Sequence, residues 1–300
     1  MNKLSSFIAV ATLFATGTGA ALAQVTTLKK VQDSGEIVMG VRESSAPLSY
    51  TTGNNQFTGY HVELCQAIID NISKTVGKKL NVKYTAVTSQ NRIPLTQNGT
   101  VDIECGSTTN NAARQKDVAF ALTTFVTEVR MAVKAKSGIK SIAQLNGKTV
   151  ATTTGTTSVQ TLRKHKAAEK ATFKELFGKD MADSFQLVES GRADAFVMDN
   201  NILAGLIATS KNPKDYAIVG EVLSVEPIAI MIRKDDPGMK KIVDLTISGK
   251  MADGSLAKMY DKWFTKPIPP QNNSVGLPMS ATLKALFKES NDKPMEAYNK

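Results

Sequence analysis

The sequence is poor in the side chains that most often bind metal ions: its 300 residues include two cysteines and two histidines. Cys65, Cys105, His61 and His165 are not spaced as metal ligands, so the sequence predicts neither a metal site nor a cofactor. It also has no arginine-rich run, zinc-finger spacing or interleaved basic and aromatic residues, which argues against nucleic-acid binding. Beyond the N-terminus, no stretch is long and apolar enough to cross a bilayer.

The composition is typical of a soluble globular protein. Hydrophobic residues make up 42% and charged residues 21% of the chain, which is long enough for two domains. The formal charge of +10 comes from lysines scattered among acidic residues and not from one tract. We interpret this charge as a solvated basic surface that helps to attract anionic ligands.

The N-terminus predicts export. Lys3 precedes a short apolar core, Phe7–Phe14, and Ala21-Leu22-Ala23 has the small-x-small pattern of a cleavage site. Residues 1–23 are therefore expected to be a signal peptide that is removed from the mature chain. An exported protein lies in an oxidising space, so a disulfide between Cys65 and Cys105 is the default expectation. Two buried free thiols are the alternative.

Strand-like segments alternate with segments of helical spacing, which predicts an α/β fold. Strands are expected at residues 36–41, 80–87, 101–104, 125–134, 145–152, 193–198, 217–222 and 228–233. Helices are expected at residues 28–34, 60–76, 159–170, 185–191, 202–208, 235–248, 254–262 and 279–287, with a further helix beginning at 112.

Three of the expected strands end in polar residues that include an arginine. In open α/β sheets ligands bind beyond the carboxyl ends of the strands, so these arginines are candidate site residues and not only surface groups. Arg114 would lie in the first turn of a helix capped by Asn110 or Asn111, where it could bind a carboxylate through two hydrogen bonds. The candidates at these three strand ends are Arg42, Ser89, Arg92, Ser107, Thr109 and Arg114.

The second half of the chain adds two more junctions of this kind. Thr153 and Thr156 belong to a glycine and hydroxyl segment before the helix expected at 159–170, although such residues also serve as simple helix caps. Asp199 ends the strand expected at 193–198 and is a natural partner for an ammonium group.

Taken in order, these motifs resemble the periplasmic solute-binding proteins of amino-acid ABC transporters, of the glutamate/aspartate-binding type (solute-binding protein family 3). The resemblance covers nearly the whole mature chain. It is carried by Arg42–Ser45, Thr88–Arg92, Glu104–Asn111 with Arg114, Thr154–Ser158, Glu189–Arg192, Arg233–Pro237 and Asp261–Pro270. It implies a type II fold of two α/β lobes joined by two crossing strands, with lobe 1 at 24–128 and 227–300 and lobe 2 at 129–226.

The resemblance also implies roles for the candidate residues. Arg114 would bind the α-carboxylate of the ligand with Thr153 and Thr156, while Asp199 would bind the α-ammonium with Ser107 and Thr109. Arg42, Arg92 and Ser89 would bind the side-chain carboxylate. Three arginines against one aspartate suit L-glutamate or L-aspartate, delivered by a periplasmic monomer to a membrane permease.

One segment departs from the pattern of the family. Glutamate/aspartate binders often carry Asp-His-Gly-Asp-Ser-Phe where this chain has Asp180–Phe185, so Met181 replaces a histidine expected at the ligand. Binding of the amides, glutamine and asparagine, therefore stays open as an alternative.

Two other functions also stay open. A dehydratase of the same fold could use Glu43 or Asp199 as its base, but His61 and His165 are expected on helices away from the strand ends. The second open function is that of a sensor module that presents its ligand to a receptor.

Overall fold

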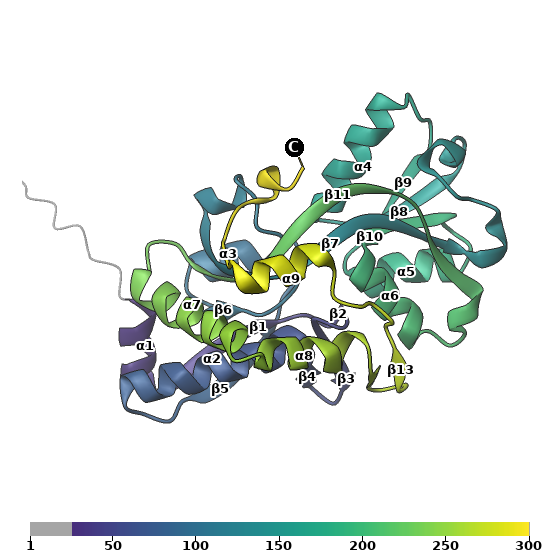
Figure 1. The fold of residues 1–300 in the computed structure, drawn as a ribbon. Helices are drawn as coiled ribbons and strands as arrows, with labels where there is room; N and C mark the ends of the chain where they lie inside the picture. Colours follow the sequence, from purple (N-terminus) through teal and green to yellow (C-terminus); the bar gives the residue numbers. More distant parts are fainter. Residues whose placement is uncertain (1–25, 300) are drawn as a thin grey trace, which may run out of the picture.

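Residues 26–299 are described by a computed structural model, so the predicted signal peptide lies outside the described residues. Eight strands form one mixed sheet in the order β5-β1-β6-β11-β7-β10-β8-β9 (Figure 1). The strands of this sheet are β1 (Glu36–Val41), β5 (Asn81–Ala86), β6 (Ile103–Glu104), β7 (Val118–Lys134), β8 (Thr149–Thr153), β9 (Lys174–Gly178), β10 (Ala195–Asp199) and β11 (Tyr216–Arg233).

The remaining strands form two smaller sheets. One sheet consists of β2 (Ser44–Ser45), β3 (Ser49–Gly53) and β4 (Gln56–Thr58), and the other of β12 (Pro267–Ile268) and β13 (Asn273–Ser274). The α-helices are α1 (Thr27–Ser34), α2 (Tyr60–Val76), α3 (Arg92–Gln97), α4 (Thr157–Ala168), α5 (Met181–Glu189), α6 (Asn200–Thr209), α7 (Pro237–Ala252), α8 (Ser255–Phe264) and α9 (Ala281–Lys288). Within residues 26–299, no helix has both the length and the apolar character that a membrane span requires.

The long strands β7 and β11 connect the two halves of the molecule. They pair antiparallel from Tyr216 opposite Lys134 to Arg233 opposite Val118, and they run between two helix-covered lobes (Figure 1). We call the part with β1, β5, β6, α2, α7 and α8 the first lobe, and the part with β8–β10 and α4–α6 the second lobe. The sequence predicted two strands at 217–222 and 228–233, but they are one strand, because Ser224–Pro227 stay paired with β7 across an irregularity in the ladder.

Each lobe has a core of its own. Phe125, Tyr260 and Phe264 stack in the first lobe, with ring centroids 4.2 to 6.1 Å apart. In the second lobe, one face of the sheet packs on Leu162 of α4 and the other on Phe185 of α5. The chain boundaries of the lobes, at 128/129 and 226/227, stay a prediction.

A disulfide joins Cys65 of α2 to Cys105, directly after β6, which confirms the predicted pairing. The two cysteines are 40 residues apart, and closing a loop of this length stabilises a chain by about 4 kcal/mol in the loop-entropy description. The disulfide therefore anchors the segment that follows β6 to the first lobe.

The helix predicted from residue 112 is wrong. The chain forms only the 3₁₀ turn Arg114–Lys116 before it enters β7 at Val118, so there is no room for an α-helix. The N-cap residue of this turn is Ala113, not Asn110 or Asn111, although Oδ1 of Asn111 accepts from the backbone N–H of Arg114 at 2.8 Å.

Candidate functional site

The segment that follows β6 is the centre of the site, and hydrogen bonds of His61 in α2 hold it in place. The two ring nitrogens of His61 bond to the carbonyl oxygen of Gly106 at 2.6 Å and to Oγ1 of Thr124 at 2.8 Å. Burial lowers the pKa of His61 to about 4, so the ring is neutral near pH 7. The prediction that His61 lies away from the strand ends is wrong, because α2 packs directly against this segment.

Arg42 and Arg92 meet at Ser107, and both side chains are buried. Nη1 of Arg42 donates to Oγ of Ser107 at 3.3 Å, and Nη1 of Arg92 donates to its carbonyl oxygen at 3.2 Å. Burial and the neighbouring Arg114 lower the pKa of Arg92 to about 9. Ser89 is also buried, and its hydroxyl has no hydrogen-bond partner within residues 26–299.

Arg42 already has a carboxylate partner. Its Nη2 pairs with Asp180 from the second lobe, and Oγ of Ser44 donates to the other oxygen of Asp180 at 2.8 Å. The sequence analysis did not include Asp180 among the site residues, since nothing in the local pattern before α5 indicates that it reaches across to Arg42, directly after β1, and to Ser44. Beside it, Met181 is 1% exposed and packs in the core with Phe185.

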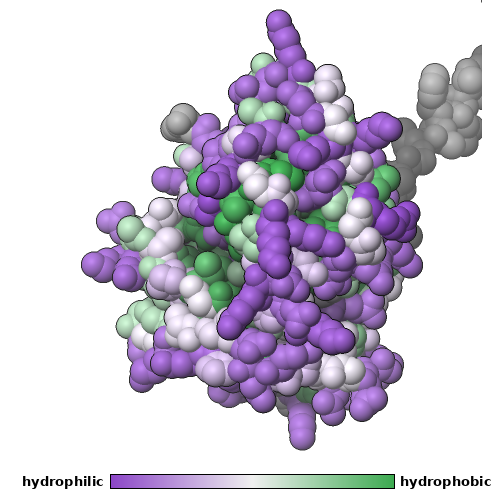
Figure 2. Space-filling view, turned by 90° about the vertical axis from the view of Figure 1, so that its right-hand side faces the viewer, coloured by the Kyte–Doolittle hydropathy of each residue, from purple (hydrophilic) through white to green (hydrophobic). Residues whose placement is uncertain are grey.

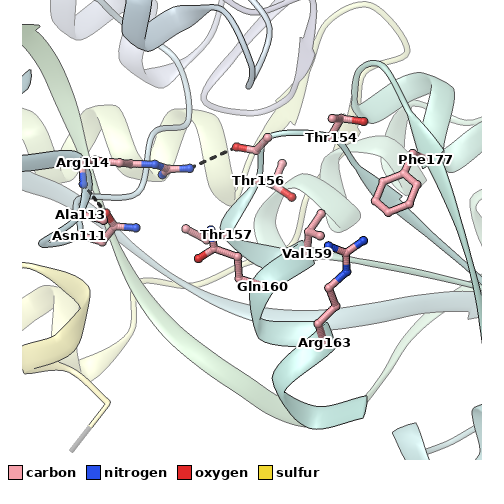
Figure 3. A pocket seen from close by; sticks show the side chains of 11 residues that line it. Asn111, Ala113, Arg114, Thr154, Thr156, Thr157, Val159, Gln160, Arg163 and Phe177 are labelled. Atoms are coloured by element: carbon pink, nitrogen blue, oxygen red, sulfur yellow. Dashed lines mark hydrogen bonds between the residues drawn. The ribbon is translucent and has the colours of Figure 1, made fainter. Parts of the chain in front are cut away.

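Arg114 also spans the two lobes. Its Nη1 donates to the carbonyl oxygen of Thr109 at 2.9 Å, and its Nη2 donates to that of Gly155 in the second lobe at 3.4 Å (Figure 3). Gly155 has φ of +82°, and a Cβ atom there would lie 2.9 Å from the backbone nitrogen of Gln90. Glycine is therefore required both for the backbone angle and for the close approach of the lobes.

The second lobe contributes hydroxyl groups at the start of α4. Oγ1 of Thr156 donates to the carbonyl oxygen of Thr153 at 2.8 Å, while Oγ1 of Thr153 lies 2.7 Å from Oγ of Ser184. Both threonines are buried. Gly155, which lies between them in the chain, is the residue that contacts the first lobe, through its carbonyl oxygen and Arg114.

Asp199 ends β10 and is almost fully buried. Its Oδ1 accepts no hydrogen bond from any residue between 26 and 299. Burial, followed by the negative charge of Glu226, raises the pKa of Asp199 well above its usual value, while Arg92, Arg114 and Arg42 oppose this effect. A cation placed beside Asp199 would restore its charged form.

Two further buried acids, Glu104 and Glu226, were missed by the sequence analysis. Glu104 lies in β6 and accepts from Oγ1 of Thr108 at 2.7 Å. Glu226 accepts from Thr109 and Thr157 at 2.6 Å each. The count of three arginines against one aspartate was therefore incomplete, because Asp180, Glu104 and Glu226 add three carboxylates to the same region.

A cavity of about 550 Å³ lies where the two lobes face each other (Figure 3). Its walls include Arg114 and Thr156 from the predicted set, while the other seven predicted residues are buried and do not line it. The cavity is lined by Asn111, Ala113, Arg114, Thr154, Gly155, Thr156, Thr157, Val159, Gln160, Arg163 and Phe177. Among residues 26–299, no group of His, Cys, Asp or Glu is placed to bind a metal ion.

Two lobes joined by two long strands, with charged groups buried between them, define a protein that binds a small molecule between its lobes. The chain belongs to the bacterial extracellular solute-binding proteins, family 3, which it matches over residues 37–266. It is 46% identical over 277 residues to the glutamate/aspartate import solute-binding protein of Escherichia coli K12, and the match covers 92% of each chain.

Solved structures confirm the predicted type II fold. A mutant of ArgBP from T. maritima superposes with a TM-score of 0.70 at 26% identity, over 80% of this chain and 100% of that one. The ancestral amino acid-binding protein AncCDT-1, described as a precursor of cyclohexadienyl dehydratase, has a TM-score of 0.67 at 29% identity, over 80% of this chain and 99% of that one.

Proposed function

We propose that this protein is the substrate-binding component of an ABC importer that captures L-glutamate and L-aspartate in the periplasm and delivers them to a membrane permease. The observation that carries the proposal is the convergence of Arg42, Arg92 and Arg114 on the Ser107–Thr109 segment, opposite Asp199. The 46% identical relative named for glutamate and aspartate import supports the same ligand class.

Each end of the ligand has candidate partners. Arg114, Thr153 and Thr156 bind the α-carboxylate, because Arg114 already reaches from the first lobe to the backbone beside these threonines. Asp199, Ser107 and Thr109 bind the α-ammonium, and the unpaired Oδ1 of Asp199 is the strongest acceptor there.

Arg42, Arg92 and Ser89 bind the side-chain carboxylate. Arg92 carries the greater share, since Arg42 is paired with Asp180 whereas no carboxylate within residues 26–299 forms an ion pair with Arg92. The buried guanidinium of Arg92 gains a counter-ion from the ligand.

The lobes, 24–128 with 227–300 and 129–226, close on the ligand through a hinge in β7 and β11. The protein acts as a monomer after loss of residues 1–23. No catalytic step is part of this function, and no cofactor is needed.

Calorimetric titration of the mature protein with L-glutamate tests the site, with Arg92→Ala compared with Arg192→Ala. Arg192 is exposed and serves as the matched control. We expect one-to-one binding that Arg92→Ala weakens at least 30-fold and Arg192→Ala leaves unchanged, because losing one partner of a buried hydrogen-bonded charge pair costs about 2–5 kcal/mol. Equal affinities of the two variants would remove Arg92 from the site.

The similarity to AncCDT-1 makes dehydration of a carboxylated ring the second candidate function. Incubation with carboxylated cyclohexadienyl compounds, followed by proton NMR, separates the two functions. Binding without conversion agrees with a transport protein, and turnover of any such compound would replace the proposal with an enzyme.

A further inference from the structure

Glu226 lies in β11, where the two lobes meet, and its side chain is fully buried. Its Oε2 accepts from Oγ1 of Thr109 in the first lobe and from Oγ1 of Thr157 in the second lobe, each at 2.6 Å. Its Oε1 accepts from Oγ of Ser224 at 2.9 Å. Three hydroxyl groups therefore surround this carboxylate, and no cation within residues 26–299 forms an ion pair with it.

The Glu226 carboxylate fixes the direction in which the Thr109 hydroxyl points. A threonine hydroxyl has one hydrogen, and an ionised carboxylate can only accept. The hydroxyl hydrogens of Thr109 and Thr157 are therefore both donated to Oε2 of Glu226. The two hydroxyl oxygens lie 3.4 Å apart, but neither has a second hydrogen to donate to the other. Thr109 has only lone pairs left for a ligand.

A hydroxyl with only lone pairs left suits a group that only donates. An ammonium group has hydrogens to donate and no lone pair to offer, so it matches Thr109 as Glu226 orients it. Glu226 also adds a second buried negative charge close to Asp199, whose Oδ1 has no partner within the described part of the chain. An uncharged group in this place would leave the Oδ1 of Asp199 without a positively charged donor, and within residues 26–299 the attraction of Arg114 would be all that the two acids share.

We propose that Glu226 is a positioning residue for the ligand ammonium: it holds the Thr109 hydroxyl as an acceptor and makes the site select a cationic donor at the α-carbon. It acts through Thr109 and does not itself touch the ligand. This inference rests on the proposed function, since it concerns the same site and names the group on the ligand that Glu226 recognises.

The test compares two ligands that differ only at the α-carbon, L-glutamate and (S)-2-hydroxyglutarate. Both are titrated calorimetrically into the wild-type protein, Glu226→Gln and Ser224→Ala. We expect Glu226→Gln to lower the affinity for L-glutamate at least tenfold and the affinity for the hydroxy acid less than threefold. The preference for the ligand with the ammonium group would then fall. Ser224→Ala, which leaves both bonds to Oε2 in place, is expected to keep the wild-type preference.

If the role of Glu226 is purely structural, Glu226→Gln will lower the affinities for both ligands by the same factor, and that result would overturn the inference. Glu226→Asp provides a second test should Glu226→Gln fail to fold. It keeps the charge but withdraws the carboxylate from Thr109, so the preference is again expected to fall, and an unchanged preference would contradict us. If the wild-type protein binds no L-glutamate, the proposed function itself fails, which is a different outcome from an unchanged preference.

Discussion

Among single residues, the buried arginines Arg42 and Arg92 differ in how they are paired, and our proposal gives them different shares in binding the ligand. Asp180 already neutralises Arg42, whereas the guanidinium of Arg92 donates to the backbone carbonyl oxygen of Ser107. The positions of the arginines at strand ends could be predicted from the sequence, because each follows a strand that the pattern identifies. Asp180, Glu104 and Glu226 could not, since their roles depend on which elements meet in space.

Met181 stands where the family resemblance implies a histidine, and Met181→His tests the effect of this position. Met181 is buried beside Phe185, so an imidazole there is expected to reduce the free energy of unfolding by about 1–3 kcal/mol. We also expect it to tighten binding of at least one of L-glutamate and L-aspartate, measured by calorimetry. Met181→Leu is the apolar control, and unchanged affinities for both acids in Met181→His would show that this position does not tune the ligand.

His61 makes the stability of the protein depend on pH. Its pKa is about 4 in the folded protein and near 6.5 in the unfolded chain, so only the unfolded chain takes up this proton between these values. The stability that neutral His61 provides is therefore complete above pH 6.5 and is lost as the pH falls towards 4. The loss is about 3 kcal/mol at 1.36 kcal/mol per pH unit.

Urea unfolding at pH 4.5, 5.5 and 6.5 measures this loss, with His61→Gln as the comparison. The variant cannot titrate at this position, so its stability should fall less over the same range. Parallel pH profiles of the two proteins would rule out His61 as a main source of the dependence.

Among the elements, those with clear local signals were predicted well. The bounds of β1 and α2 match the prediction, because a glycine in the left-handed conformation marks an end of each. Gly35 ends α1 directly before β1, and Gly77 ends α2. β11 was predicted as two strands, since Pro227 and the residues before it look like a break, yet pairing with β7 continues across them. Tertiary pairing decided the outcome there.

The C-terminal segment after α9 contacts β11, the strand that runs between the lobes. Oδ1 of Asn299 accepts from the backbone N–H of Val225 at 2.8 Å, and its Nδ2 donates to the carbonyl oxygen of Val225 at 2.7 Å. The backbone N–H of Met295 donates to the carbonyl oxygen of Asn110 at 2.8 Å. This segment thus connects the strand between the lobes with the start of the 3₁₀ turn that holds Arg114.

The side chain of Asn299 also donates to the carbonyl oxygen of Met295 at 2.9 Å, which makes three hydrogen bonds in all. Asn299→Ala should therefore lower the melting temperature by a few degrees, because these exposed bonds contribute about 1–3 kcal/mol in total. Asn212→Ala is the control, at an exposed asparagine. Differential scanning calorimetry measures both. Equal melting temperatures for the two variants would mean that the contact with Val225 contributes little.

Across the whole molecule, the two lobes are in contact over the site. The ion pair of Arg42 with Asp180 and the bond from Arg114 to Gly155 both cross from one lobe to the other. The face shown in Figure 2 is mostly hydrophilic, with hydrophobic residues visible mainly in its hollows.

Gly155→Ala tests whether this contact is needed for binding. A Cβ atom at Gly155 would lie 2.9 Å from the backbone nitrogen of Gln90, so the lobes could not approach as closely. We expect at least a tenfold loss of affinity for L-glutamate by calorimetry. Gly147→Ala is the matched control, because Gly147 has a similar φ of +73° and no atom within 4 Å of the added Cβ. Equal losses in the two variants would show that backbone strain, and not closure, is responsible.

The central claim is that the site binds amino acids with two carboxylates. The most direct test is a calorimetric titration of the wild-type protein, freed of bound ligand by unfolding and refolding, with L-glutamate, L-aspartate, L-glutamine and L-asparagine. Our account predicts one-to-one binding of the two acids, each at least tenfold tighter than its amide, because an amide leaves buried Arg92 without a counter-ion. Amides that bind as tightly as the acids, or tighter, would contradict it.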